Sequence, residues 1–423
     1  MRKRRVYLDH ASSTSVDTAI FDFMKPYFTD KYGNPGGMHL FGQEAQVAID
    51  DSRDKAARFF GCDFSEIVFT GSATEANNLA IRGIVKNTLL AIPNFIPHIV
   101  TSKIEHSSVL ETLRDLERNG VEVTYLDVNG EGFVNPDNIA NAIKDTTILI
   151  SIMYASNEIG TIQPIQKISQ VVLNARKNFS KTPKLSKAAN IMLMGRVENH
   201  EETSHGKEPL LSGAPYFHTD AVQALNYLDC NVSRLGVDML TFSGHKIYGP
   251  KGIGGLYVKK NTPIASIITG GKQEMGFRSG TENVPYIVGF GMAVEIAGNM
   301  RIAETVRLEK LRDYFVREVI KRIPSAKLNG PQKSGRLANN ANFLFKGFPA
   351  NNLIIALDRE GIAVSSGATC TIKTVVSSET LMAIGLDKEE AKQSLRFTFG
   401  RGTTEKDLEY VLFNLEDIVN KNR

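Results

Sequence analysis

Residues 239–258 read MLTFSGHKIYGPKGIGGLYV, and the pattern of this stretch indicates the class of the fold. Its two apolar runs, Met239–Ser243 and Gly255–Val258, contain almost no charged positions, as expected for strands that helices cover on both faces. Lys246 follows the end of the first run, and a glycine-rich turn comes after it. The stretch therefore predicts two buried strands, with a reactive side chain at the end of the first.

The same pattern recurs between residues 65 and 260, where short β-rich runs alternate with helical stretches. Five further strands are predicted, at 67–70, 98–102, 122–126, 147–154 and 216–219. Such alternation predicts an α/β fold with a mostly parallel sheet and right-handed crossovers. We expect residues 16–262 to form a large domain around a seven-stranded sheet.

After about residue 265 the pattern changes. A long amphipathic helix is predicted around residues 308–319, strands around 342–345 and 395–399, and a final helix that begins at Thr404. We expect a smaller α+β domain built from residues 1–15 and 263–423.

A polar stretch at about 175–213 interrupts this organisation. It connects the end of a predicted helix to the strand at Tyr216, which is the amino edge of the sheet, whereas ligands bind at the carboxyl edge. His200 and His205 are five residues apart and would not share a helical face, so a metal site is not predicted. We expect a solvated insertion away from the ligand site of its own chain.

Composition excludes several classes of protein. Hydrophobic residues make up 42% and charged residues 23%, and the net charge of +4 is too small to indicate a nucleic-acid partner. No apolar run approaches the roughly 20 residues that span a membrane, and no apolar stretch follows the basic start MRKRR. The three widely spaced cysteines, Cys62, Cys230 and Cys370, indicate a reducing compartment. We expect a cytoplasmic protein that needs neither a membrane nor nucleic acid.

Polar groups follow five of the predicted strand ends, and the carboxyl ends of parallel strands meet at one edge of a sheet. The groups are Ser72 or Thr74 at a glycine turn, His106, Asn157, Asp220 and Lys246. A lysine there can form a Schiff base with an aldehyde cofactor, and a carboxylate can keep a pyridine nitrogen protonated. A helix that begins after a glycine turn can bind phosphate with its first N–H groups.

Each group also has a structural explanation when it is considered alone. Lys246 fits an exposed lysine in a glycine-rich turn, Asp220 fits a helix N-cap, and a solitary His106 is more often structural. The glycines do not form a P-loop, because no Gly-Lys-Ser/Thr ends the run. The presence of all five groups at one edge favours a functional site.

Together the motifs resemble the cysteine desulfurases of the NifS/IscS type, in the class V aminotransferase family of fold-type I pyridoxal phosphate enzymes. The resemblance covers nearly the whole chain outside 175–213. It is carried by YLDHASST (7–14), GNP (33–35), FTGSATEANN (69–78), IEHSS (104–108), FHTDAVQ (217–223), TFSGHK (241–246), RSGTEN (278–283), VSSGATCT (364–371) and LRFTFGR (395–401).

The resemblance implies a set of cofactor contacts. Lys246 would hold pyridoxal 5′-phosphate and act as a base, and His106 would stack on the ring. Asp220 would pair with the ring nitrogen, and Gln223 would contact the phenolic oxygen. The remaining cofactor contacts would be Ala73, Thr74, Ser243 and His245 at the phosphate, Asn157, and Thr281 reaching the phosphate of a neighbouring subunit in a homodimer.

The resemblance also implies the reaction. Arg396, with Asn157 and Asn34, would bind the carboxylate of L-cysteine, and the Cys370 thiolate would attack the substrate sulfur. The products would be L-alanine and a persulfide for iron–sulfur cluster or other thio-cofactor biosynthesis, passed to a sulfur-acceptor or scaffold protein. Gly71-Ser72 stands where Ser-Gly is usual, and the customary Glu-Pro-Ser after the cysteine is absent. Selenocysteine lyase, class V transamination and a non-catalytic scaffold of a sulfur-transfer complex remain alternatives.

Overall fold

The computed structural model describes residues 4–179, 214–332, 334–366 and 377–421. Within these ranges, no helix combines the length and the apolar character that a membrane span requires. Two predictions, the insertion at about 175–213 and the reactive Cys370, fall wholly or largely outside the described residues.

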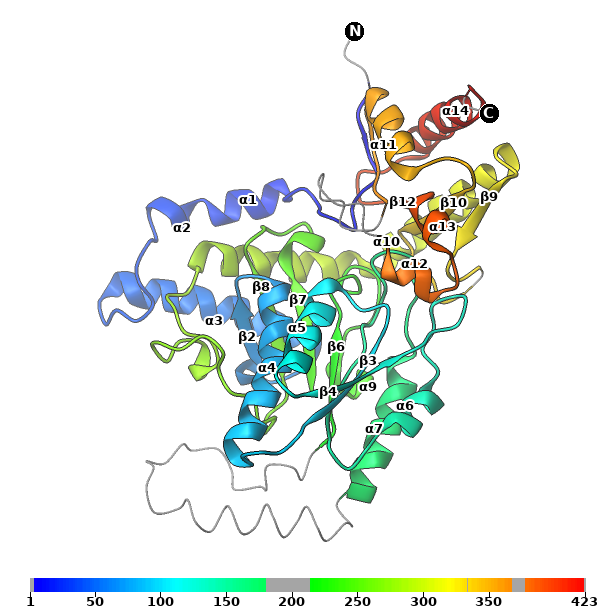
Figure 1. Ribbon diagram of the computed structural model, residues 1–423. Coiled ribbons are helices and arrows are strands. Elements are labelled where there is room, and N and C mark those ends of the chain that lie inside the picture. The colour runs from blue at the N-terminus through cyan, green and yellow to red at the C-terminus, as the bar shows by residue number, and fades with distance from the viewer. Residues whose placement is uncertain (1–3, 180–213, 333, 367–376, 422–423) are drawn as a thin grey trace.

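A seven-stranded sheet forms the centre of the larger part of the molecule (Figure 1). Its strands are β2 (Ile67–Thr70), β3 (His98–Ser102), β4 (Glu122–Leu126), β5 (Thr147–Ser151), β6 (Tyr216–Asp220), β7 (Met239–Ser243) and β8 (Gly254–Val258). The strand order is β2-β8-β7-β6-β5-β3-β4, and β8 alone runs opposite to the other six strands. The predicted mostly parallel sheet is confirmed, although β5 ends at Ser151 rather than Tyr154.

Helices cover both faces of this sheet, so nearly every strand position is buried. Consecutive residues of β2, such as Val68 and Phe69, point to opposite faces of the sheet and belong to different hydrophobic clusters. The Val68 side packs against α4 (Ala73–Ala91) and α5 (Ser107–Arg118). The Phe69 side packs against α1 (Thr18–Met24), α3 (Leu40–Phe60), α6 (Pro136–Ala142), α7 (Ile165–Phe179), α9 (Val232–Leu235) and α10 (Val284–Arg322). The short α2 (Pro26–Thr29) links α1 to α3.

The smaller part of the molecule contains a three-stranded antiparallel sheet, ordered β12-β10-β9. Its elements are β9 (Ala326–Asn329), β10 (Asn340–Phe345), α11 (Ala350–Arg359), α12 (Glu379–Ala383), α13 (Lys388–Lys392), β12 (Ser394–Thr398) and α14 (Glu405–Lys421). A separate parallel pair joins β1 (Val6–Tyr7) to β11 (Ile362–Ala363). The N-terminal segment thus joins the C-terminal elements, where Leu8 packs with Phe343 and Phe397 in one cluster.

Helix α10 contributes both to the hydrophobic cluster on the Phe69 side of the large sheet and to the cluster of the small part. Its first half places Phe290 and Val294 against the large sheet, and its second half places Phe315 and Val319 among the residues of the small sheet. The helix therefore packs against both sheets, and the domain division near residue 262 stays a prediction.

The candidate functional residues follow the carboxyl ends of the parallel strands. Lys246 ends a short 3₁₀ turn, Gly244–Lys246, directly after β7, and Asp220 is the last residue of β6. Because β8 is antiparallel, its first residue, Gly254, also lies at this edge. The sheet therefore collects these groups where the small part of the molecule meets it.

Candidate active site

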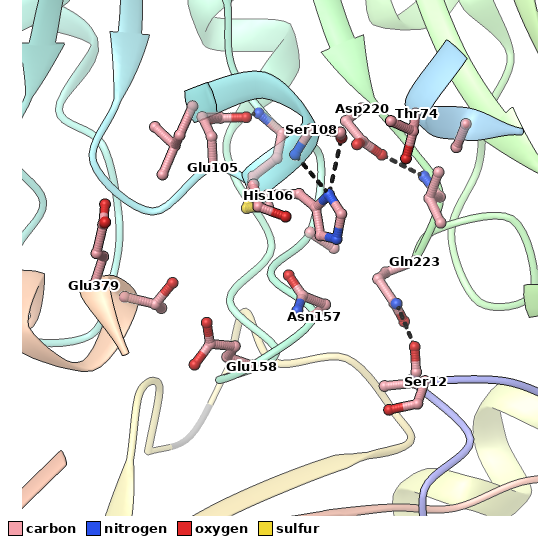
Figure 2. Close-up of a pocket in the computed structure, with 18 of the residues that line it drawn as sticks. Ser12, Thr74, Glu105, His106, Ser108, Asn157, Glu158, Asp220, Gln223 and Glu379 are labelled. Atoms are coloured by element: carbon pink, nitrogen blue, oxygen red, sulfur yellow. Dashed lines mark hydrogen bonds between the residues drawn. The ribbon is translucent and has the colours of Figure 1, made fainter. Parts of the chain in front are cut away.

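One cavity of about 550 Å³ lies at the carboxyl edge of the large sheet. Nine of the predicted site residues line it: Ala73, Thr74, His106, Asn157, Asp220, Gln223, His245, Lys246 and Arg396. Figure 2 shows His106, Asp220, Gln223 and Asn157 around the same open space. The prediction that separate strand ends supply one site is therefore matched by the geometry.

The Lys246 amine has a strongly lowered pKa. Burial and the nearby Arg396 together lower its pKa to about 8, although Asp9 and Asp220 act in the opposite direction. Its Nζ donates to the backbone carbonyls of Ala11 at 2.5 Å and Ser12 at 2.6 Å. Near neutral pH this amine therefore gives up its proton far more readily than a lysine in water, whose pKa is 10.5.

Helix α4 presents its N-terminus to the cavity. Ser72 is the N-cap, and its Oγ accepts the Glu75 N–H at 3.1 Å. The N–H groups of Ala73 and Thr74 precede the first intrahelical bond and have no partner within the described residues. The backbone at Gly254 lies close to this turn, since a Cβ there would stand 2.6 Å from the Ala73 nitrogen. The start of α4 is thus an anion-binding position.

His245 lies at the cavity wall, and Ser243 supports it from behind. Ser243 is fully buried and does not line the cavity; its Oγ lies 2.9 Å from His245 Nδ1. Burial, Lys246 and Lys251 lower the pKa of His245 to about 4. His245 is therefore neutral at physiological pH, and its second ring nitrogen is available to a ligand.

Asp220 ends β6, and Gln223 follows on the next turn. Asp220 is buried, and its Oδ1 accepts the Val222 N–H at 3.0 Å. Gln223 donates from Nε2 to the Ala11 carbonyl at 3.0 Å (Figure 2). Asp220 is therefore held by hydrogen bonds and faces the cavity without a cationic side chain bonded to it among the described residues.

His106 follows β3 and caps α5. Its Nδ1 accepts the Ser108 N–H at 3.1 Å and lies 2.8 Å from the Ser108 hydroxyl. Burial lowers the pKa of His106, Asp220 raises it and Lys246 lowers it. The ring reaches solvent through the cavity, although protein surrounds it on its other sides.

Arg396 lies on β12 and joins the two parts of the molecule. Its guanidinium donates to the Asn157 carbonyl at 2.9 Å, to Asp9 Oδ1 at 2.7 Å and to Ser12 Oγ at 2.8 Å. The Nε atom is buried and has no partner among the described residues. An unpartnered buried guanidinium nitrogen is costly unless a ligand accepts from it. Arg396 is therefore suited to a carboxylate ligand.

Several acidic residues at the cavity escaped sequence reasoning, and two of them, Glu105 and Glu158, have raised pKa values. Glu105 is buried; its Oε1 accepts from Ser102 and from the Met153 N–H, and Oε2 has no partner within the described ranges. Burial raises the pKa of Glu105 to about 8. Glu158 accepts from the Ser378 hydroxyl at 2.5 Å, and burial raises its pKa as well. Both adjoin predicted residues in the chain, and that adjacency was the only available signal.

Besides Ser243, two predicted residues do not line the cavity of their own chain. Thr281 and Asn34 are exposed and lie outside its lining, and Asn34 Oδ1 accepts the Gly36 N–H at 3.0 Å. Cys370 is outside the described residues. The chain enters and leaves the segment 367–376 at this cavity, because Ser365, Ser377 and Ser378 line it.

Comparison with known proteins adds the family. A family model described as aminotransferase class-V matches residues 6–179 and 209–411, and it leaves out residues 180–208 within the predicted insertion. The chain belongs to the class-V aminotransferase family. Within that family it is of the NifS/IscS type, since the curated relatives it matches carry that name.

A cysteine desulfurase IscS from Dictyoglomus turgidum is 44% identical to this class-V aminotransferase over 421 residues, covering 100% of this chain and 96% of the relative. Among solved structures, a NifS-like protein is 31% identical with a TM-score of 0.83, covering 99% of this chain and 100% of that chain. A structure of SspA in complex with cysteine is 32% identical with a TM-score of 0.74, covering 93% and 98% of the two chains.

Proposed function

We propose that this chain is a pyridoxal phosphate-dependent cysteine desulfurase, which converts L-cysteine to L-alanine and transfers the sulfur to Cys370 as a persulfide. The observation that carries the proposal is the content of one cavity: an amine with a lowered pKa, a buried carboxylate, a neutral histidine and a guanidinium whose Nε has no partner among the described residues. The relatives named cysteine desulfurase, and the solved relative in complex with cysteine, support the same activity.

The residues present fit the cofactor. The unpaired N–H groups at the start of α4, with Thr74 and His245, would hold the phosphate, because a helix N-terminus favours anions. Lys246 would bind the aldehyde, and Asp220 would keep a proton on the pyridine nitrogen. When bound, the ring supplies an electron sink that stabilises negative charge at the substrate α-carbon.

The chain's own residues would then bind and deprotonate the substrate. Arg396 would bind the cysteine carboxylate in a charge-assisted pair, with Asn157 beside it. Lys246 would move the proton at the α-carbon, because its lowered pKa lets it act as a base near neutral pH. The Cys370 thiolate would form the new S–S bond while the carbon–sulfur bond of the substrate breaks, leaving alanine after protonation of the β-carbon.

The two described cysteines are unsuited to this attack. Burial raises the pKa of both Cys62 and Cys230 to about 12, so neither forms a thiolate at neutral pH. Neither lines the cavity. This leaves Cys370, whose segment begins and ends at the cavity wall, as the proposed nucleophile.

The finer biological setting is also a proposal. The product persulfide would pass to a sulfur-acceptor or iron–sulfur scaffold protein in the cytoplasm. We propose a homodimer in which Thr281 serves the partner's cavity, and a division at residue 262 into a large cofactor-binding domain and a small domain with the cysteine segment. The exposure of Thr281 and its absence from its own cavity support the shared site.

The test is to incubate the holoenzyme with L-cysteine and a thiol reductant and to measure alanine and sulfide together. Equal amounts of both products are expected. Cys370→Ser should abolish both, whereas the matched Cys62→Ser should keep wild-type turnover because that thiol is inert. Full turnover by Cys370→Ser, with a keto acid as product, would instead identify a transaminase.

A further inference from the structure

A buried amide connects Asp220 to Ser108, which in turn contacts His106. Asn77 lies on the second turn of α4 and is fully buried. Its Nδ2 donates to Asp220 Oδ2 at 2.8 Å and to Ser108 Oγ at 2.8 Å. Both protons of one NH₂ group are therefore used, one toward the carboxylate and one toward the residue that contacts His106.

The carboxylate decides which way the amide faces. An ionised carboxylate only accepts hydrogen bonds, so the NH₂ side of Asn77 has to point toward Asp220. In this orientation Asn77 Oδ1 is buried and has no partner among the described residues. A side chain kept only for packing would not be expected to leave a buried carbonyl without a hydrogen bond, since that is unfavourable. We therefore interpret the two hydrogen bonds that Asn77 donates, to Asp220 and to Ser108, as its role in the structure.

The Asn77–Ser108 hydrogen bond sets the direction of the next hydrogen bond, between Ser108 and His106. Ser108 Oγ accepts from Asn77, so its single proton remains for His106 Nδ1 at 2.8 Å. The Ser108 N–H also donates to the same ring nitrogen at 3.1 Å. Nδ1 therefore accepts twice and carries no proton, which leaves the ring proton on Nε2.

The surroundings agree with a neutral ring. His106 caps the N-terminus of α5, where the helix dipole disfavours positive charge. Burial lowers the pKa of His106, Asp220 raises it and Lys246 lowers it. Figure 2 shows the ring nitrogen that is not bonded to Ser108 pointing into the open space of the cavity. Only that nitrogen can meet a ligand.

We propose that Asn77 and Ser108 are positioning residues that lock His106 in its Nε2–H tautomer while the same amide fixes the Asp220 carboxylate. His106 then offers the cavity a hydrogen-bond donor and keeps its basic nitrogen out of reach. Proton removal from the substrate falls to Lys246. The assignment of the tautomer stands on these contacts alone, and its catalytic consequence rests on the proposed function.

The direct test is nitrogen NMR of ¹⁵N-histidine-labelled, cofactor-free protein, in which no activity is needed. The His106 resonances, assigned with His106→Asn, should show an unprotonated Nδ1 and a protonated Nε2 at pH 7. Ser108→Ala should raise the pKa of His106 by about one unit, because two stabilising donations to the neutral ring become one. Ser108→Thr, which restores a hydroxyl, should return the pKa to the wild-type value.

The small sheet offers matched controls. Asn329 is likewise a buried amide whose Nδ2 donates twice, to Asn342 Oδ1 and to Ser394 Oγ. Neither Asn329 nor Ser394 lines the cavity, so Asn329→Ala and Ser394→Ala should lower stability and leave the His106 resonances unchanged.

The catalytic consequence is tested with the holoenzyme. Asn77→Ala should lower kcat on the order of 10-fold with KM changed less than about twofold, since it misplaces groups without touching the substrate. A protonated Nδ1 in wild-type protein, or an unchanged His106 pKa in Ser108→Ala, would overturn the tautomer assignment. If the tautomer is as expected but wild-type holoenzyme produces no alanine and sulfide, the proposed function fails and the positioning network stands.

Discussion

At the scale of single residues, the site depends on charges that are removed from water. The Lys246 amine is bonded to two carbonyls of the N-terminal segment, and a lysine held among carbonyls would ordinarily stay charged. Burial and the positive Arg396 disfavour the charged amine more strongly than the carbonyls favour it, and the pKa falls to about 8. Arg396 thus has two effects: it offers a guanidinium to a carboxylate, and it favours the neutral amine that must react with an aldehyde.

This balance predicts the pH dependence of cofactor loading. The rate at which cofactor-free protein takes up pyridoxal phosphate should rise with pH through a midpoint near 8, because only the neutral amine attacks the aldehyde. Arg396→Met should move the midpoint upward, since a repelling charge is lost. Stopped-flow absorbance measures the rate, and Arg58→Met on the exposed face of α3 is the control. A wild-type midpoint near 10.5 would contradict the argument.

The raised pKa of Glu105 predicts a second pH effect: the free energy of unfolding should fall as pH rises. Its pKa is about 8 in the folded protein against an ordinary value of 4.5, so the folded state binds the extra proton. Its contribution is complete below pH 4.5 and is lost as pH rises to 8, at about 1.4 kcal/mol per pH unit.

Glu105→Gln keeps the oxygen that accepts from Ser102 and Met153 but removes this ionisation. Urea unfolding of both cofactor-free proteins between pH 5 and 9 should therefore show the variant gaining on wild type as pH rises. The difference should level off above pH 8. A difference that is constant across the range would show that Glu105 ionises normally in the folded state.

At the scale of elements, the strands of the large sheet were predictable because both of their faces are buried and their apolar runs are nearly continuous. Three strands of the small part were missed for physical reasons. The edge strand β9 contains lysine and asparagine, and β1 and β11 are two residues long, so none has a readable period.

The site was predictable to the same extent. Groups that directly follow a strand, such as Lys246 and Asp220, were found from their position in the chain. Asp9 and Ser12 bond to Arg396 across more than 380 residues, and no local pattern carries that information. Asn77 was quoted within a motif, but its contacts form only when α4 and α5 pack side by side.

The contact between β8 and the start of α4 predicts that Gly254→Ala will damage phosphate binding. The added Cβ would stand 2.6 Å from the Ala73 nitrogen and the Ser72 carbonyl carbon, so backbone has to move. Cofactor affinity should fall at least on the order of 10-fold, with a loss of about 1–3 kcal/mol in unfolding free energy.

Fluorescence titration of cofactor-free protein with pyridoxal phosphate measures the affinity. Gly130→Ala is the matched control, since the nearest atom to its Cβ would be the Ile384 carbonyl oxygen at 3.8 Å, an ordinary contact. Unchanged affinity in Gly254→Ala would mean that the phosphate does not bind at the start of α4.

At the scale of the whole molecule, the described chain leaves apolar surface uncovered along its first helices. The large exposed side chains there are Phe21, Phe23, Phe28, Tyr32, Met38, Leu40, Phe41 and Val47. A patch of this kind is unusual on a monomer and is typical of a subunit interface. Together with Thr281, which is exposed and absent from its own cavity, it supports the proposed homodimer.

A shared site predicts complementation between two inactive variants. In a dimer of Lys246→Ala and Thr281→Tyr, one cavity would carry both defects, and the other would combine an intact Lys246 with an intact Thr281 from the partner subunit. Random mixing makes half of the dimers hybrid, each with one working site, so about a quarter of wild-type activity should return. Mixing Lys246→Ala with Asp220→Ala is the control, since both residues serve the same cavity and every site stays defective.

Alanine production after co-refolding measures the recovery, and sedimentation velocity verifies that hybrids form. Hybrid dimers without recovered activity would mean that Thr281 does not serve the partner's cavity, and the shared-site proposal would fall.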